Sequence, residues 1–282
     1  MTTAETTNGS VMAEATFLQQ ALANARGTLA TLVRPPRRSI VWPSAGQIAL
    51  AVAGAAVAVL AVMVTIDAWA IAQAPRLSTR LVDALNRFTD LGKGGFFLWP
   101  LGLALIALSF LSTSALPRMS RLVLAAWAVR IGFVFTAIAV PGLFVTIVKR
   151  LIGRARPLVV GHDAMAFVPF GWKVDYASLP SGHATTAFAA LVAIGAIFPQ
   201  ARALLWIYAG LIALSRVVLT SHYPSDVVAG ALVGAAGAWL VQQWFAARGL
   251  GFAVTEAGAV RPMPGPRLPR IVKALARRLH AA

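Results

Sequence analysis

Six apolar stretches separated by polar and basic segments dominate the chain. A helix needs about 20 apolar residues to cross the hydrocarbon core of a bilayer. Four stretches are long enough and carry no charge, namely residues 48–66, 96–116, 131–148 and 227–247. Two more, residues 184–198 and 203–219, are shorter, and length alone would also allow buried or re-entrant helices. Polar residues gather at one end of each, as in helices that line a watery cavity. The pattern predicts an all-α protein, a polytopic membrane helical bundle with six transmembrane helices.

Composition supports a membrane location. Of the 282 residues, 59% are hydrophobic and only 12% are charged, and the mean hydropathy is +0.75. A soluble domain carries roughly twice that share of charged residues. The chain has no cysteine, which excludes disulfides and thiolate metal sites.

The formal net charge of +16 constrains the partners. In a soluble protein such a charge would favour nucleic acid, but here the basic residues lie in the tails and between apolar stretches. We therefore expect no nucleic acid, and instead anionic membrane lipids at the basic tails and a phosphorylated substrate. Six spans place both tails on one side, which carries more Lys and Arg than the other. That side is therefore expected to be cytoplasmic.

Three regions follow from this pattern. Residues 1–44 form a cytoplasmic tail with a rough amphipathic stripe, residues 45–247 form the six-span core, and residues 248–282 form a basic, proline-rich cytoplasmic tail. Within the last region, residues 270–279 have the pattern of a short basic helix lying on anionic lipid. A solvated, disordered tail is an equally good reading of that segment.

A first polar cluster follows the third predicted span. Lys149, Arg150, Arg154 and Arg156 place four cations within eight residues. Guanidinium groups suit bidentate contact with phosphate oxygens, and Lys supplies a compact point charge. Basic residues can also merely flank a membrane helix. That is the default on the cytoplasmic face, whereas this cluster is expected on the other face, so we favour an anion site.

A second cluster, Pro180-Ser181-Gly182-His183, directly precedes the fourth predicted span. Ser is a favoured N-cap, so a helix is expected to begin here. Its free N–H groups and positive dipole end suit phosphate, and Gly182 allows close approach of the backbone. The alternative is a simple cap beside an interfacial histidine.

A third cluster joins the fifth and sixth predicted spans. Arg216 lies inside an apolar stretch, where a guanidinium is costly unless it faces a cavity or a partner. Pro224 leaves His222 on the connecting loop. Asp226 falls in the first turn of the last span, from where it can hydrogen-bond one nitrogen of His222 and make the other a better base or nucleophile. A helix-capping aspartate beside an unrelated histidine is the alternative.

Alternating spans bring these clusters to one membrane face. Two imidazoles would lie here among three cations. The cations would repel a divalent metal ion but attract a phosphate dianion, so we expect neither a metal nor a cofactor. Lys93 is a further candidate for contact with a headgroup. The residues expected at this face are Lys149, Arg156, Ser181, Gly182, His183, Arg216, His222 and Asp226.

These motifs resemble the three-part signature of the type 2 phosphatidic acid phosphatase superfamily. The resemblance covers roughly residues 91–247 and rests on three matching segments: Lys149 with Arg156-Pro157, Pro180-Ser181-Gly182-His183, and Ser215-Arg216 with His222 and Asp226. It implies that His222 is the nucleophile that forms a phosphohistidine and that Asp226 orients it. It also implies that His183 is the general acid and later the base, and that the remaining site residues bind phosphate without a metal.

The resemblance implies a phosphatase of the bacterial inner membrane with its active site at the periplasmic face. Its substrate would be a lipid phosphate monoester or pyrophosphate, such as undecaprenyl pyrophosphate, phosphatidic acid, phosphatidylglycerophosphate or lipid A. A lipid phosphotransferase, which passes the phosphate to a sugar or lipid acceptor, is the main alternative. The intact signature argues against a scaffold with a decayed site, and the lack of paired broken helices argues against a transporter.

Overall fold

The computed structural model describes residues 42–111, 117–161 and 163–265, with residue 40 and scattered positions between 19 and 37. The chain forms two compact units. The larger unit comprises Ile40–Leu101 and Phe133–Trp244, and the smaller unit comprises Met1–Ser39, Gly102–Gly132 and Phe245–Ala282. The predicted basic helix at 270–279 lies outside the described residues.

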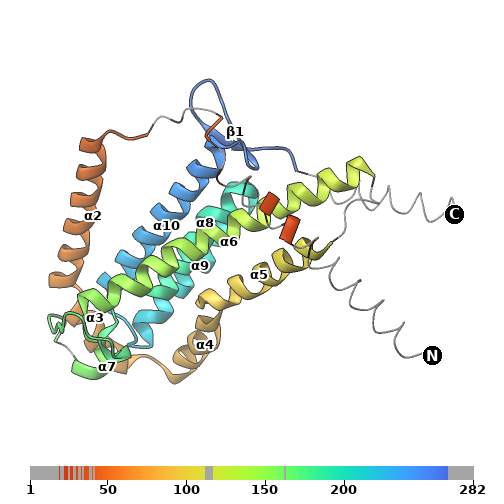
Figure 1. Ribbon diagram of the computed structural model, residues 1–282. Helices are drawn as coiled ribbons and strands as arrows, with labels where there is room; N and C mark the ends of the chain where they lie inside the picture. The colour runs from red at the N-terminus through yellow and green to blue at the C-terminus, as the bar shows by residue number, and fades with distance from the viewer. Residues whose placement is uncertain are drawn as a thin grey trace, which may run out of the picture. The chain divides into compact units, whose positions relative to one another are not determined.

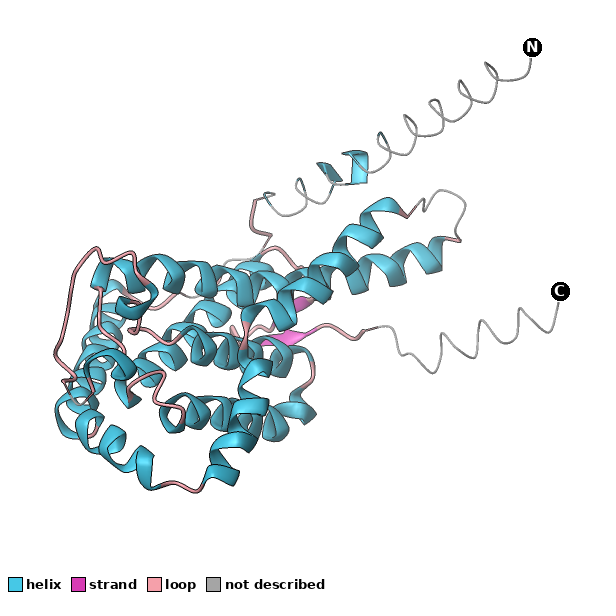
Figure 2. Ribbon diagram, turned by 90° about the horizontal axis from the view of Figure 1, so that it is seen from below, coloured by secondary structure: helices cyan, strands magenta, loops and turns pink. Residues whose placement is uncertain are grey.

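The described chain is almost entirely helical, which confirms the all-α prediction (Figures 1 and 2). Its strands are confined to one antiparallel hairpin. The helices and strands are α2 (Ala45–Thr65), α3 (Asp67–Gln73), α4 (Thr79–Thr89), α5 (Gly94–Phe110), α6 (Arg118–Ile152), α7 (Pro157–Val160), α8 (Gly182–Ile197), α9 (Arg202–Val218), α10 (Pro224–Ala247), β1 (Phe252–Val254) and β2 (Val260–Pro262).

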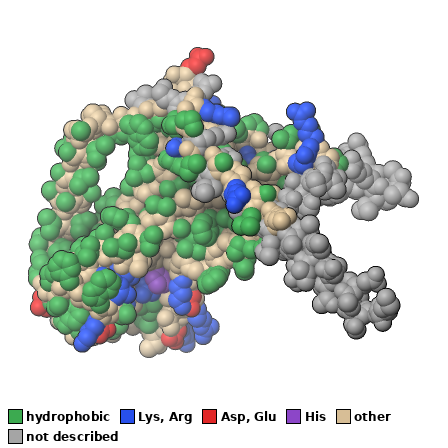
Figure 3. Space-filling model, in the orientation of Figure 1, with side chains coloured by type: hydrophobic (Ala, Val, Ile, Leu, Met, Phe, Trp, Pro, Cys, Tyr) green, Lys and Arg blue, Asp and Glu red, His purple; other side chains and the backbone are tan. Residues whose placement is uncertain are grey.

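Five helical segments in the described residues are long and apolar enough to cross a bilayer. They are Ala45–Thr65, Thr79–Phe110, Arg118–Ile152, Pro199–Val218 and Pro224–Ala247. Large apolar side chains such as Leu50, Trp99 and Leu204 stand at least 70% exposed on them, and green surface dominates Figure 3. Water does not tolerate so much exposed apolar surface, so this is a membrane protein. The fourth predicted span, residues 184–198, forms α8, which has only 16 residues, so six spans are not confirmed.

Helix α8 is short and buried because small residues fill it. Most of its side chains are inaccessible, and α10 presents glycines to its backbone. A Cβ on Gly230 would lie 2.4 Å from the carbonyl oxygen of Ser181, and one on Gly234 would lie 2.3 Å from that of Thr185. Small residues allow such close helix contact. The packing brings the N-termini of α8 and α10 together, and the Ser181 N–H donates to the Asp226 carbonyl at 2.9 Å.

Helix α9 packs against α8 and α4 on another side of this core. Leu191 of α8 and Ile212 of α9 belong to one buried cluster, and Phe88 and Leu91 pack against it. The Tyr208 hydroxyl of α9 donates to the carbonyl of Leu91 at 2.9 Å. These contacts hold the segment after α4 beside α8 and α9, where the candidate site lies.

The smaller unit contains the hairpin and the first part of α6. Phe252 pairs with Pro262 and Val254 with Val260 in the β1–β2 register. The guanidinium of Arg130, on α6, donates to the Met263 carbonyl at 2.8 Å. This bond ties the chain after β2 to α6.

Candidate active site

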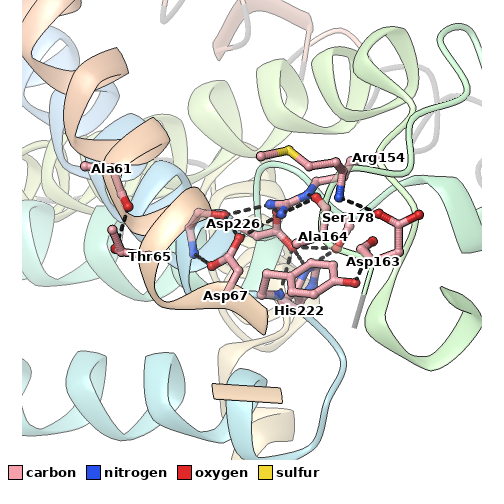
Figure 4. Close-up of polar contacts among 12 residues, drawn as sticks. Ala61, Thr65, Asp67, Arg154, Asp163, Ala164, Ser178, His222 and Asp226 are labelled. Atoms are coloured by element: carbon pink, nitrogen blue, oxygen red, sulfur yellow. Dashed lines mark hydrogen bonds and ion pairs between the residues drawn. The ribbon is translucent and has the colours of Figure 1, made fainter. Parts of the chain in front are cut away.

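A buried ion-pair network underlies the site (Figure 4). Arg154 lies between two carboxylates: its Nη2 donates to Asp67 Oδ2 at 2.7 Å and its Nη1 to Asp226 Oδ1 at 2.6 Å. All three side chains are fully buried. Nε and Nη2 of Arg154 also donate to the Ala164 carbonyl. The sequence grouped Arg154 with the anion-attracting cations, and that interpretation was wrong, because its charge is already taken up by carboxylates.

The other cations of the first cluster divide into two kinds. Arg150 donates to the carbonyl of Trp172 and lies over its ring, 5.7 Å from the centroid, so its contacts go to that loop. Lys149, in the last turn of α6, lies within electrostatic range of Arg156. The backbone N–H of Arg156 donates to the backbone carbonyl of Asp175 at 2.8 Å. The Nε of its guanidinium is buried without a hydrogen-bond partner. The cluster therefore offers Lys149 and Arg156 to an anion.

Helix α8 begins where the sequence predicted, at Gly182 after Ser181. The Ser181 side chain does not cap the helix, however, because its Oγ is buried and makes no hydrogen bond. His183 lies in the first turn, and its Nε2 is likewise buried without a partner. A Cβ on Gly92 would lie 3.1 Å from His183 Cδ2, so the segment after α4 packs against this ring.

Arg216 is buried in the last turn of α9, at 7% exposure. Its Nη1 donates to the hydroxyl of Thr89 at 2.7 Å, and Ser215 contacts the same hydroxyl at 2.9 Å. Its Nε makes no hydrogen bond. Thr89, at the end of α4, thus orients the guanidinium. No sequence pattern pointed to Thr89, since a lone threonine on a helix has no distinctive signal.

His222 lies in the turn between α9 and α10, as predicted, and is 3% exposed. Its backbone N–H donates to the Arg216 carbonyl at 3.2 Å. Its Nδ1 lies 3.6 Å from Asp226 Oδ2 and 3.4 Å from Ser178 Oγ (Figure 4). Asp226 occupies the first turn of α10, where it also accepts from the Tyr223 N–H at 2.9 Å. These contacts occupy Nδ1 and leave Nε2 as the ring nitrogen for chemistry.

The two imidazoles and the guanidinium groups influence one another. The charges of Arg216 and His222 act on His183. Burial lowers the pKa of His222, the nearby Asp226 carboxylate opposes this shift, and the charges of Arg156 and Arg216 reinforce it. The two histidines therefore lie within electrostatic range of each other and of Arg216.

Buried polar atoms without a partner gather in the same place. Among the described residues they include Arg156 Nε, Ser181 Oγ, His183 Nε2 and Arg216 Nε. Each can donate a hydrogen bond, and a buried donor without an acceptor costs about 1–3 kcal/mol. An oxyanion supplies several acceptors at once. Figure 3 shows Lys and Arg side chains around a histidine at the end of the larger unit that carries α3, α4 and α7.

The fold is that of a helical membrane protein, and the candidate site holds two histidines and basic side chains with buried polar atoms that lack partners. Residues 130–250 match the sequence model of the PAP2 superfamily. The match confirms the resemblance inferred from the three motifs.

Two kinds of characterised phosphatase are similar in sequence. Lipid A 1-phosphatase of Rhizobium etli is 37% identical over 129 residues, which cover 45% of this chain and 55% of that protein. Decaprenylphosphoryl-5-phosphoribose phosphatase of Mycobacterium tuberculosis is 38% identical over 133 residues, covering 46% and 65%. The chain thus spans about half the length of the lipid A 1-phosphatases that it matches.

Two solved structures are also similar. LpxE of Aquifex aeolicus superposes with a TM-score of 0.43 at 24% identity, covering 59% of this chain and 88% of that chain. The first transmembrane PAP2 type phosphatidylglycerolphosphate phosphatase from Bacillus subtilis gives a TM-score of 0.48 at 19% identity, covering 68% and 94%.

Proposed function

We propose that this protein is an integral membrane phosphatase that hydrolyses a lipid phosphate monoester or pyrophosphate through a phosphohistidine. The observation that carries the proposal is the set of four buried, unpaired polar atoms beside His222. They come from three segments of the chain, namely the loop after α6, the start of α8 and the end of α9, and all of them suit phosphate oxygens. Phosphoryl transfer depends mainly on positioning and charge stabilisation, which such a site supplies.

In the first step, His222 Nε2 attacks phosphorus while the bond to the lipid oxygen breaks. His183 Nε2 gives its proton to that oxygen, so the alcohol or phosphate leaves in its protonated form. Lys149, Arg156 and Arg216 hold the phosphoryl oxygens together with the Ser181 hydroxyl and the Gly182 N–H. His222 keeps its Nδ1 proton, and the Asp226 carboxylate, 3.6 Å from Nδ1, stabilises the positive ring that forms.

In the second step, water attacks the phosphohistidine. The neutral His183 takes a proton from that water, the phosphorus–nitrogen bond breaks, and its electron pair returns to His222 Nε2. Inorganic phosphate leaves, and His183 is again protonated. The unliganded site suits this cycle, because His183 Nε2 is buried there without an acceptor and the charge of the bound phosphate is what stabilises its proton.

The proposed reaction needs no metal ion. Lys149, Arg156 and Arg216 supply the charge that a divalent cation would otherwise bring, and they would repel one. EDTA should therefore leave phosphate release unchanged, and restoration of lost activity by Mg²⁺ or Zn²⁺ would contradict this part of the mechanism.

For topology, we propose that α8 is the sixth crossing, that both termini are cytoplasmic and that the site faces the periplasm of a bacterial inner membrane. The absence of cysteine allows a direct test. An impermeant maleimide should label Lys173→Cys in intact cells and Glu256→Cys only after permeabilisation. The reverse pattern would contradict the orientation.

The substrate class is best tested on the purified full chain. The relatives are named for lipid A and for decaprenylphosphoryl-5-phosphoribose, and these two belong in a panel with undecaprenyl pyrophosphate, phosphatidic acid and phosphatidylglycerophosphate. We expect phosphate release from at least one, lost in His222→Ala. Labelled lipid or sugar products without free phosphate would identify a phosphotransferase, and no reaction with any of the five would overturn the proposal.

A further inference from the structure

The mechanism above does not use Asp67, although this carboxylate is among the most deeply buried groups of the larger unit. Asp67 begins α3 and has no accessible surface. Its Oδ1 accepts the backbone N–H of Ser225 at 2.9 Å, and its Oδ2 accepts the Ser225 hydroxyl and Arg154 Nη2. It therefore binds both the first turn of α10 and the guanidinium that contacts Asp226.

The charges of this network are unequal in number. Asp67 and Asp226 carry two negative charges and Arg154 carries one positive charge, so the fully buried trio has a net charge of −1. Without Asp67, Arg154 and Asp226 would form a neutral pair, and the field that Asp226 exerts on His222 would largely cancel. In a buried site with a low dielectric constant such a difference is large.

Resting on the proposed phosphohistidine mechanism, we propose that Asp67 is a positioning residue that preserves the negative charge of Asp226 for His222. Asp67 neutralises Arg154, and Arg154 and Ser225 in turn hold Asp226 in place. The ring of His222 becomes positive when its Nε2 bonds to phosphorus, because Nδ1 keeps its proton. Asp67 thus stabilises the intermediate and the transition state that leads to it without touching the substrate.

Vanadate and inorganic phosphate separate this role from a merely structural one. Vanadate can bond to His222 Nε2 and make the ring positive, whereas phosphate held by the same cations forms no such bond. Asp67→Asn keeps the shape of the side chain but removes its charge. We expect it to weaken vanadate binding about tenfold or more and phosphate binding by less than about twofold, measured by calorimetry on the purified full chain.

Two controls make the test specific. Asp83→Asn applies the same change to an exposed carboxylate on α4 and should alter neither affinity. The double variant Asp67→Asn/Arg154→Gln restores the net charge of −1 and should bind vanadate more tightly than Asp67→Asn alone. If Asp67→Asn cannot be purified, Arg154→Gln is compared with the double variant Asp67→Asn/Arg154→Gln. The double variant should then bind vanadate about tenfold more weakly than Arg154→Gln.

The outcomes are distinguishable. Equal weakening of vanadate and phosphate would show a structural role and overturn this inference, as would an unchanged vanadate affinity. A wild type that shows the expected vanadate pattern but releases phosphate from no lipid would overturn the proposed function and leave the charge relationship standing. A wild type that binds no vanadate would overturn both.

Discussion

The Ser178 hydroxyl connects the two residues on which the chemistry depends: it lies 2.5 Å from Asp226 Oδ2 and 3.4 Å from His222 Nδ1. Asp226 itself lies 3.6 Å from the same ring nitrogen. The ring is thus held from its Nδ1 side by a hydroxyl and a carboxylate, which fixes the proton on Nδ1 and directs Nε2 toward the phosphoryl group.

In the proposed mechanism, His222 is the nucleophile. His222→Ala should show no turnover above background and no acid-labile phosphoryl label after quenching with radioactive substrate. The Arg156, Ser181 and Arg216 groups remain, so the variant should still bind inorganic phosphate. Substantial turnover, or a phosphoryl label on another residue, would refute the assignment.

The origin of the proton on His183 predicts a pH dependence. In the unliganded site His183 Nε2 is buried without an acceptor, near the positive charge of Arg216, and this setting favours a neutral imidazole in the free enzyme. The proton must therefore arrive with the phosphate monoanion, whose second pKa is about 6. We expect kcat/KM to fall as the pH rises through the second pKa of the substrate.

Two substrates whose phosphate groups differ by about one unit in second pKa provide the test. The alkaline limb of kcat/KM should move with the substrate. In His183→Ala, turnover of p-nitrophenyl phosphate should be slow and should lose this limb, because that leaving group needs no proton. A limb at the same pH for both substrates would mean that an enzyme group sets it.

The contact between Arg216 and Thr89 predicts that the guanidinium cannot be replaced. Nη1 is already committed to the Thr89 hydroxyl, and Nε remains available for phosphate. A lysine ammonium cannot hold both directions at once. Arg216→Lys should lower kcat about 100-fold or more, as the loss of one preorganised donor does. The control Arg87→Lys, at an exposed position of α4, should have no effect on kcat. An Arg216→Lys rate within a few-fold of wild type would contradict a forked contact.

Much of this structure follows from local sequence chemistry. The predicted span at 48–66 is α2 to within a few residues, Ala45–Thr65, because an apolar run and a Ser44 capping box define it locally. The start of α10 also follows from Pro224, and α8 begins at Gly182 as predicted, although the Ser181 side chain does not cap it. These features depend on neighbours in the chain, which the sequence displays directly.

The buried network does not follow in this way. Arg154 looks like its neighbours Arg150 and Arg156, and only the packing of α3 against the loop after α6 brings Asp67 to it across 87 positions. Asp67 and Ser178 likewise acquire their roles from partners far along the chain. The one available signal was an aspartate directly after an apolar run, since an unpaired carboxylate there would be costly.

Ser181 offers a test that separates binding from folding. Its Oγ is buried and unpaired, so Ser181→Ala removes no hydrogen bond and should leave the thermal unfolding temperature unchanged or slightly raised, while lowering kcat/KM. Ser44, which caps α2 through Gln47, is the matched control. Ser44→Ala should lower stability by about 1 kcal/mol without affecting turnover. A stability loss in Ser181→Ala equal to that of Ser44→Ala would show that Ser181 acts as a helix cap.

The contact between α8 and α10 should tolerate no added side-chain atoms at its glycines. A methyl group on Gly230 would meet the Ser181 carbonyl, and one on Gly234 would meet the Thr185 carbonyl, each closer than atoms can approach. Both alanine variants should lose about 1–3 kcal/mol of stability, the cost of overpacking. Gly210→Ala on α9, where no atom lies within 4 Å, should be neutral or slightly stabilising.

Because Gly230 contacts Ser181 itself, Gly230→Ala should also lower turnover more than Gly234→Ala at temperatures where both remain folded. Equal turnover in the two variants would mean that the position of Ser181 does not control the reaction.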